Sequence, residues 1–209
     1  GEAPSQRFRF EQYLAQLEKD GFEIEYDSFL SADNWRHIYQ KAGFLSKMDI
    51  MLKAWWGRVK AFKKLKNTDY IFIHREMAQW GPPIFEWILA KIYKKQFIYD
   101  FDDAIWLPNY SESNKWVHRI KWYGKVKYII KWADQVVVGN SYLQSYALQF
   151  NKNVVVIPTT IDLRSQHVLT TKYHSEKQII GWTGTHTTMN YLDELIPVIE
   201  KLELEFDFE

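Results

Sequence analysis

Short runs of β-branched and aromatic residues alternate with longer amphipathic stretches along most of this 209-residue chain. The clearest runs cover residues 70–73, 97–99, 136–138 and 154–157. Strands separated by helical segments of this length do not pair as tight hairpins, and the pattern is typical of a parallel sheet with crossover helices. The sequence therefore predicts an α/β fold.

The amphipathic stretches predict helices over residues 5–20, 35–66, 83–95, 113–133, 141–150 and 188–202. Residues 22–26 alternate between apolar and charged side chains, which predicts one further half-buried strand. Pro197 falls inside the last predicted helix, where it lacks an N–H donor and crowds the preceding turn. We expect a kink there.

A second α/β domain is expected to begin at Gln178, where a strand-like run leads into a glycine turn and a helix start. The N–H groups of a helix N-terminus suit phosphate, so a nucleotide-type ligand is expected at this turn. We expect an N-terminal domain over residues 1–162, a polar linker over 163–177 and the truncated start of a second domain over 178–209. No strand precedes the first helix, so we expect both ends to be trimmed.

Composition excludes several classes of protein. The chain has no Cys, so thiolate metal sites, cysteine nucleophiles and disulfides are impossible, which fits a reducing compartment. Its 27 basic and 26 acidic residues give a net charge of +1, and this balance does not imply nucleic acid as a partner. No signal peptide and no apolar run of membrane-spanning length is present. We expect a cytoplasmic protein, or one peripheral on the inner face of the membrane.

The residues that follow each predicted strand are polar, and ligands of open parallel sheets bind at this edge. His74 and Glu76 follow the first run, Asp100, Asp102 and Asp103 follow the second, and Asn140 follows the third. Three carboxylates within four residues repel one another unless cations or hydroxyl donors face them. One reading is structural, with an Asp capping a helix and another pairing with a core arginine. A Mg²⁺ site and a site for sugar hydroxyls are the other two.

Arg7 and Arg9 lie in the first turn of the first predicted helix, where the helix dipole disfavours cations. Local physics therefore does not explain them. Either they face an anion or the Asp cluster, or they are ordinary surface arginines.

Two basic segments carry interleaved aromatic residues: one runs from Lys47 to Lys66 and the other from Lys115 to Lys131. Helices of this composition can lie on an anionic membrane surface. The competing interpretation is a solvated helix whose aromatic stripe belongs to the core. The alternative function that follows is a non-catalytic α/β module that binds membrane surfaces.

Several motifs together carry a resemblance to a known family. They are Ser5-Gln-Arg-Phe-Arg-Phe-Glu-Gln-Tyr-Leu14, Ile73-His-Arg-Glu76, Tyr99-Asp-Phe-Asp-Asp-Ala-Ile-Trp106, Ala133-Asp-Gln-Val-Val-Val-Gly-Asn-Ser-Tyr-Leu143, Val156-Ile-Pro-Thr-Thr-Ile-Asp162 and Gly181-Trp-Thr-Gly184. Their order and spacing resemble glycosyltransferase family 4, the retaining group with the GT-B fold. The resemblance covers nearly the whole chain.

This resemblance implies two Rossmann-like domains, each a parallel sheet with helices on both faces, that face each other across a cleft. It implies transfer of a sugar from a nucleotide-sugar to a glycan or lipid-linked acceptor, with no cofactor and no obligatory metal. Asp102 and Asp103 would be catalytic, and Asp102 stands where many relatives carry a histidine. The implied acceptor-side residues are Arg7, His74, Glu76, Asp100 and Asn140, and the implied donor-side residues are Gly181, Thr183, Gly184 and Thr185.

Parts of the family pattern are missing from this chain: the basic residues that clamp the diphosphate, the Glu-x7-Glu motif and the first strand. Residues 1–209 are therefore expected not to turn over donor by themselves. A phospho-acceptor domain using Asp102 and Asp103 with Mg²⁺ is disfavoured, since such domains do not lead into a second glycine turn. A nicotinamide enzyme is disfavoured because Gly181-x-x-Gly184 is not a full dinucleotide fingerprint.

Overall fold

The structure, a computed structural model, describes residues 4–39, 43–65, 67–108, 121–163, 179–182 and 192–206. The chain separates into two compact units, Gly1–Asp162 and Leu163–Glu209, and each is described by itself.

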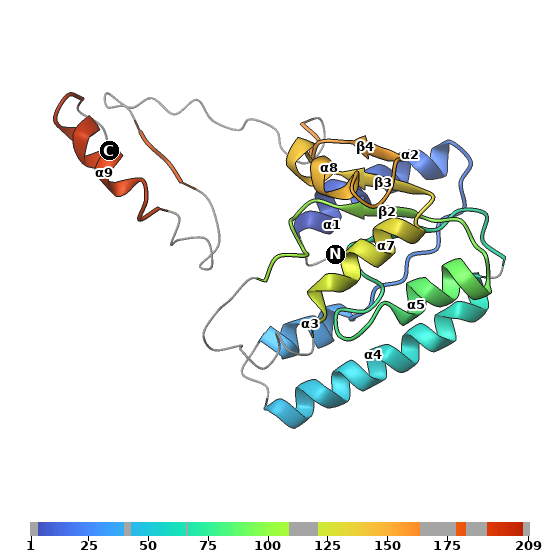
Figure 1. Cartoon of the computed structure of the whole chain (residues 1–209). Coiled ribbons are helices and arrows are strands. Elements are labelled where there is room, and N and C mark those ends of the chain that lie inside the picture. The colour runs from blue at the N-terminus through green and yellow to red at the C-terminus, as the bar shows by residue number, and fades with distance from the viewer. Residues whose placement is uncertain are drawn as a thin grey trace. The chain divides into compact units, whose positions relative to one another are not determined.

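The first unit is built on a parallel sheet, which confirms the α/β prediction with a Rossmann-like arrangement (Figure 1). Its four strands are β1 (Phe72–His74), β2 (Ile98–Phe101), β3 (Gln135–Val138) and β4 (Val154–Val156), in the order β1-β2-β3-β4. In the register, Ile73 lies beside Tyr99 and Tyr99 beside Val136. The three strand-to-strand pairings are all parallel, so the carboxyl ends of the four strands meet at one edge.

Helical segments connect and flank the strands. They are α1 (Pro4–Arg9), η1 (Glu11–Tyr13), α2 (Leu14–Lys19), α3 (Ala32–Tyr39), α4 (Phe44–Leu65), α5 (Ile84–Trp87), η2 (Ile88–Ile92), η4 (Tyr123–Lys125), α7 (Val126–Trp132), α8 (Ser141–Ala147) and, in the second unit, α9 (Ile196–Glu203).

The core lies on one face of the sheet, the face that carries Ile73, Tyr99 and Val136, which are neighbours on adjacent strands. Because side chains alternate along a strand, these residues point together toward the crossover helices. Leu89 of η2 and Ile129 of α7 are fully buried against them. Burying each such side chain contributes on the order of 1.5–3 kcal/mol, which is what holds the crossovers on this face.

The N-terminal segment covers the opposite face of the sheet. The ring of Phe10, between α1 and η1, lies 5.8 Å from that of Phe72 and 5.6 Å from that of His74. Helices therefore cover both faces of the sheet, and α1 lies near the ends of β1 and β2.

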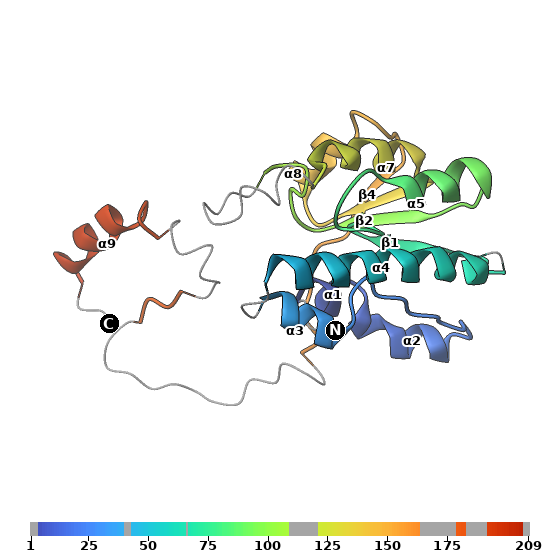
Figure 2. The same cartoon turned by 90° about the horizontal axis from the view of Figure 1, so that it is seen from below.

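Among the described residues the longest helix is α4, whose ribbon is seen in Figure 2. It packs against α5 through aromatic rings. The ring of Phe85 lies 4.6 Å from that of Trp55 and 5.7 Å from that of Phe62. The buried Arg58 of α4 donates to the Met77 carbonyl at 2.8 Å and to the Asp27 carboxylate at 2.6 Å, so α4 is also tied to two loops.

Some element boundaries differ from those predicted. The first helix is broken because the backbone leaves helical geometry at Phe10 (φ −144°) where its ring packs on the sheet. The predicted helix over residues 35–66 is two helices, α3 and α4, and the helix over 83–95 is the single turn α5 followed by a π-helical turn, η2.

The predicted strand over residues 22–26 is wrong, because this segment pairs with no strand in the described part of the chain. A strand needs a neighbour for its N–H and C=O groups. Its alternation instead places Tyr26 against Phe10, with ring centroids 5.9 Å apart.

The expected kink at Pro197 is also wrong. Helix α9 begins at Ile196, so Pro197 sits in its first turn, where a missing N–H costs nothing. Of the strand expected at the start of the second domain, the structure describes residues 179–182, and these four residues form no strand. No helix among the described residues is long and apolar enough to cross a lipid bilayer.

Candidate functional site

The candidate site lies at the carboxyl edge of the sheet, where β1 ends at His74 and β2 ends at Phe101. Asp100 is the third residue of β2, and Asp102 and Asp103 follow the strand directly. Gly139, just after β3, lies close to this turn: a Cβ added there would meet the Asp102 Cα at 3.6 Å. The parallel register thus brings the ends of three strands to one place, as the sequence predicts.

A buried ion pair forms the floor of the site. Arg9 of α1 pairs with Asp100 through two nitrogens, and the two side chains are 2% and 1% exposed. Arg9 also donates to the Ile157 carbonyl, just after β4. Removing two charges from water costs desolvation free energy, and their attraction offsets this cost only when the geometry is good and further hydrogen bonds are made. The Asp100 carboxylate is therefore a positioning group enclosed by protein.

His74 connects the Arg9–Asp100 ion pair to the loop after β2 that carries Asp102 and Asp103, which we call the acid loop. Its Nδ1 lies 2.7 Å from the Asp100 Oδ2, and its Nε2 lies 2.9 Å from the Ser5 Oγ. The Ser5 hydroxyl also donates to the Asp102 Oδ2. A hydroxyl has one proton to give, so Ser5 cannot donate to Asp102 and to the His74 Nε2 at the same time.

Arg75 holds the acid loop from the other side. Its Nε and Nη2 donate to the Asp102 Oδ1 at 3.2 and 3.0 Å, and its Nη2 also donates to Asp103. Its backbone has φ +63°, and the Glu76 N–H donates to the His74 carbonyl at 3.0 Å across it. This is a γ-turn with positive central φ, a rare and strained conformation for a residue other than glycine.

The charges at this edge keep Asp102 ionised. Burial alone would raise the pKa of Asp102, but the Arg75 charge and the hydrogen bonds from Ser5 and Arg75 outweigh it and hold that pKa below its usual value. Burial likewise lowers the pKa of Arg75, and Asp102 and Asp103 more than reverse this. The Asp102 side chain is 14% exposed and that of Asp103 is 64% exposed, so the loop offers carboxylate oxygens to solvent.

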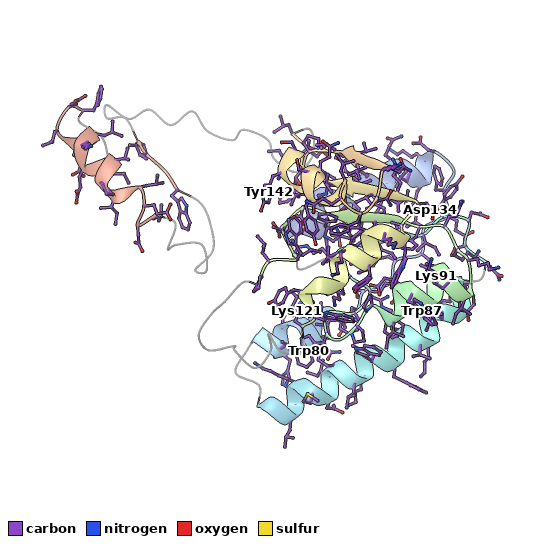
Figure 3. All side chains as sticks on the ribbon, viewed as in Figure 1. Trp80, Trp87, Lys91, Lys121, Asp134 and Tyr142 are labelled. Carbon is purple, nitrogen blue, oxygen red and sulfur yellow. The ribbon has the colours of Figure 1, made fainter. Side chains whose placement is uncertain are left out.

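An aromatic stack lies at the end of the same loop. The ring of Trp106 lies parallel to that of Tyr146 at 3.7 Å and stacks on that of Tyr142 at 6.1 Å. Tyr142 is 62% exposed and Figure 3 shows it at the margin of the sheet unit. Phe101 contacts Trp106 from the core, so the stack is anchored to β2.

Glu76 turns away from the acid loop, although it follows β1 directly. Its carboxylate pairs with the buried Lys125 of η4, which also donates to the Ala78 carbonyl at 2.7 Å and to the Gln79 carbonyl at 3.2 Å. This pair holds the loop after β1 in place. Nearby, burial raises the pKa of Glu86, whose Oε1 accepts from the Met77 N–H at 2.8 Å.

Two other predicted site residues have local roles. Asn140 is the N-cap of α8, and its side-chain oxygen accepts from the Leu143 N–H at 3.0 Å. Arg7 is exposed and its guanidinium lies 5.7 Å from the Phe8 ring, so it is Arg9, two residues later, that reaches the acids.

The predicted donor-side residues belong to the second unit. Gly181 is exposed there, with open space where a Cβ would be. Thr183, Gly184 and Thr185 lie outside the described residues.

Sequence reasoning placed His74, Asp100, Asp102 and Asp103 at one edge and considered Arg9 as a partner of the Asp cluster, but it assigned no role to Ser5 or Arg75. Arg9 had a signal, because a cation in the first turn of a helix has no local explanation. Arg75 lies between His74 and Glu76 at the end of β1, but its positive φ and its two acid partners are visible only in three dimensions. Within the described residues, no three His, Cys, Asp or Glu side chains are arranged to hold a metal ion.

Compared with models of known protein families the chain matches none, and compared with curated proteins it finds no significant relative.

Proposed function

We propose that the chain is the acceptor-side part of a glycosyltransferase, which moves a sugar with retention from a nucleotide-sugar to a glycan or lipid-linked acceptor. The observation that supports this most is the ionised, partly exposed Asp102 beside the exposed Asp103 at the carboxyl edge of a parallel sheet. Ligands of such sheets bind at this edge, and carboxylates accept strong hydrogen bonds from hydroxyl groups.

In this proposal the Asp102 carboxylate orients the acceptor hydroxyl by accepting a hydrogen bond from it. Ser5 and Arg75 fix the Asp102 carboxylate, and Asp100, His74 and Arg9 hold Ser5 and the strand ends in turn. Tyr142 offers an exposed ring for the C–H face of a sugar, because an aromatic side chain combines an apolar surface with a polar tip.

The donor diphosphate would be met by backbone N–H groups around Gly181, with Thr183, Gly184 and Thr185. Its departure leaves negative charge, and fixed N–H dipoles stabilise developing charge of this kind. The bond from the anomeric carbon to the diphosphate breaks, the acceptor oxygen joins that carbon on the same face, and the proton of the acceptor hydroxyl passes to the departing diphosphate.

Binding of sugars to the purified chain tests the proposal, measured by saturation-transfer NMR against panels of glycans and nucleotide-sugars. We expect a glycan to bind, and Asp102→Asn to weaken it about tenfold or more, since hydrogen bonds to charged groups contribute about 1.5–3 kcal/mol. Tyr142→Ala should weaken the same glycan. Asp69→Asn and Tyr70→Ala, at exposed positions before β1, are matched controls and should not. Absence of any glycan or nucleotide-sugar binding by the folded chain overturns the proposal.

One different chemistry has a specific observation behind it. Ser5, His74 and Asp100 make the contacts of a hydroxyl nucleophile, its base and an orienting acid. Asp102 competes for the Ser5 proton, and the surrounding carboxylates oppose the oxyanion that acyl transfer would form. We therefore expect no labelling by a fluorophosphonate probe. Labelling that disappears in Ser5→Ala would assign a serine hydrolase instead.

A further inference from the structure

The helical segments α4, α5 with η2, and η4 with α7 carry large apolar side chains that are exposed. Leu52 and Trp56 of α4 are 65% and 64% exposed, although α4 buries Ile50, Met51 and Phe62 on its inner side. A surface helix of a globular protein usually places polar residues on its outer face. We call this exposed side the α4–α5–α7 surface; its apolar members are Leu45, Leu52, Trp56, Val59, Ile84, Trp87, Ile92, Tyr93, Trp122 and Tyr128.

These helical segments contact one another. The ring of Phe62 in α4 lies 5.7 Å from that of Tyr93, just after η2. Between α5 and α7 lies an apolar groove of about 240 Å³, lined by Trp87 on one side and by Trp122 and Tyr128 on the other. Pockets that enclose a whole small molecule begin near 300 Å³, so this groove suits a single hydrocarbon chain or ring.

The exposed charges on the same elements are almost all positive. Their described, exposed cations are Lys53, Lys60, Lys64, Lys91, Lys127 and Lys131. The one exposed acid among the described residues of these elements is Asp49, which pairs with Lys53, while Lys64 pairs with Glu25. The whole chain has a net charge of only +1, so the positive charge is concentrated here. Figure 3 shows Trp87 and Lys91 on the α5–η2 segment.

We propose that the α4–α5–α7 surface docks on an anionic phospholipid bilayer, with the aromatic rings at the headgroup level and an acyl chain in the groove. The reason is the mixture of residues: tryptophan and tyrosine prefer the membrane interface, and lysines reach phosphates while their stems cover apolar surface. A protein partner fits less well, because lysine is depleted at protein–protein interface cores. Exposed tryptophan rings also stack nucleic acid bases, but the aliphatic Leu52, Val59 and Ile92 beside them do not, and they suit hydrocarbon.

Docking does not depend on sugar transfer, and vesicle binding tests it directly. We expect the purified chain to co-sediment with vesicles of phosphatidylcholine and phosphatidylserine, far less with phosphatidylcholine alone, and less at high salt because exposed charges are screened. Each of Lys60→Ala and Lys127→Ala should weaken binding about fivefold, the equivalent of about 1 kcal/mol per lysine near a surface. Brominated lipids should quench tryptophan fluorescence.

The double variant Trp56→Ser/Trp87→Ser removes two exposed rings and should reduce binding to anionic vesicles by more than either lysine variant. Tyr70→Ser and Lys152→Ala, exposed residues outside these elements, are the matched controls and should bind as the unchanged chain does. Circular dichroism shows that each variant is folded.

Three results overturn the proposal: no binding of the folded chain to anionic vesicles at low salt, equal binding to neutral vesicles at every salt concentration, or full binding by the double tryptophan variant. A concentration-dependent dimer that Trp56→Ser abolishes, without vesicle binding, would assign the surface to a second copy of the chain.

Discussion

Arg75 holds Asp102 by two of its nitrogens while its own backbone is in a left-handed conformation, with φ +63°. The strained γ-turn, just after β1, aims the Arg75 guanidinium at the acid loop that follows β2. A rare backbone conformation persists only where surrounding contacts compensate it, and here these contacts include the Asp102 and Asp103 carboxylates.

This relationship predicts different costs for two substitutions of Arg75. Arg75→Ala and Arg75→Gly lose the same ion pairs, but glycine adopts positive φ without a Cβ clash. We expect Arg75→Gly to be more stable than Arg75→Ala by about 0.5–1 kcal/mol in urea unfolding. Lys94, at φ +50°, is the matched control, and its Gly variant should likewise exceed its Ala variant. Equal stability of the two Arg75 variants would show that the turn is not strained.

The lowered pKa of Asp102 predicts a pH dependence of stability. The folded-state pKa lies below the unfolded value of about 3.9, so folding favours the carboxylate. Its contribution to the free energy of unfolding is fully present above that pH and is lost as the pH falls through the folded-state pKa. Asp102→Asn should make the acid-side decline shallower.

Carboxyl ¹³C NMR gives a direct measurement of the same effect. Arg75→Ala should raise the pKa of Asp102, because burial then acts without the cation that offsets it. Lys152→Ala changes an exposed charge outside the site and should leave the pKa of Asp102 unmoved. An unchanged Asp102 pKa in Arg75→Ala would contradict the electrostatic account of the site.

Arg9 and Arg7 form a matched pair for stability. Arg9→Ala leaves the buried Asp100 without its cation, and removing one partner of a buried pair costs about 3–5 kcal/mol. Arg7→Ala changes an exposed side chain of the same helix and should stay within about 0.5 kcal/mol. Thermal and urea unfolding measure both. Similar losses in the two variants would mean that Arg9 does not pair with Asp100.

Asn140 tests whether a polar residue after a strand is a cap or a ligand group. Its side chain satisfies the Leu143 N–H, so Asn140→Ala should destabilise the protein by about 1 kcal/mol, while Asn140→Ser keeps an acceptor and should cost less. Differential scanning calorimetry resolves the difference. Unchanged stability in Asn140→Ala would argue against a capping role and favour a role in ligand binding.

Much of the fold could be predicted from the sequence because the signals are local. Runs such as Val136–Val138 combine β-branched residues with buried positions, and the helical stretches between them leave only parallel pairing. The same logic placed Asp100 and Asp102 at one edge beside His74, since parallel strands end together. It failed over residues 22–26, where alternation exists without a partner strand.

The sequence by itself determined the parallel sheet and the edge where its acids gather, since β-branched runs, helical spacing and strand ends are properties of neighbouring residues. Tertiary structure alone decided that Arg9 rather than Arg7 meets Asp100, and that Glu76 leaves the edge to pair with Lys125. The partners of these two pairs are 91 and 49 positions apart in the sequence. Which side chain meets each carboxylate depends on how the helix faces pack against the sheet. No local pattern records that packing.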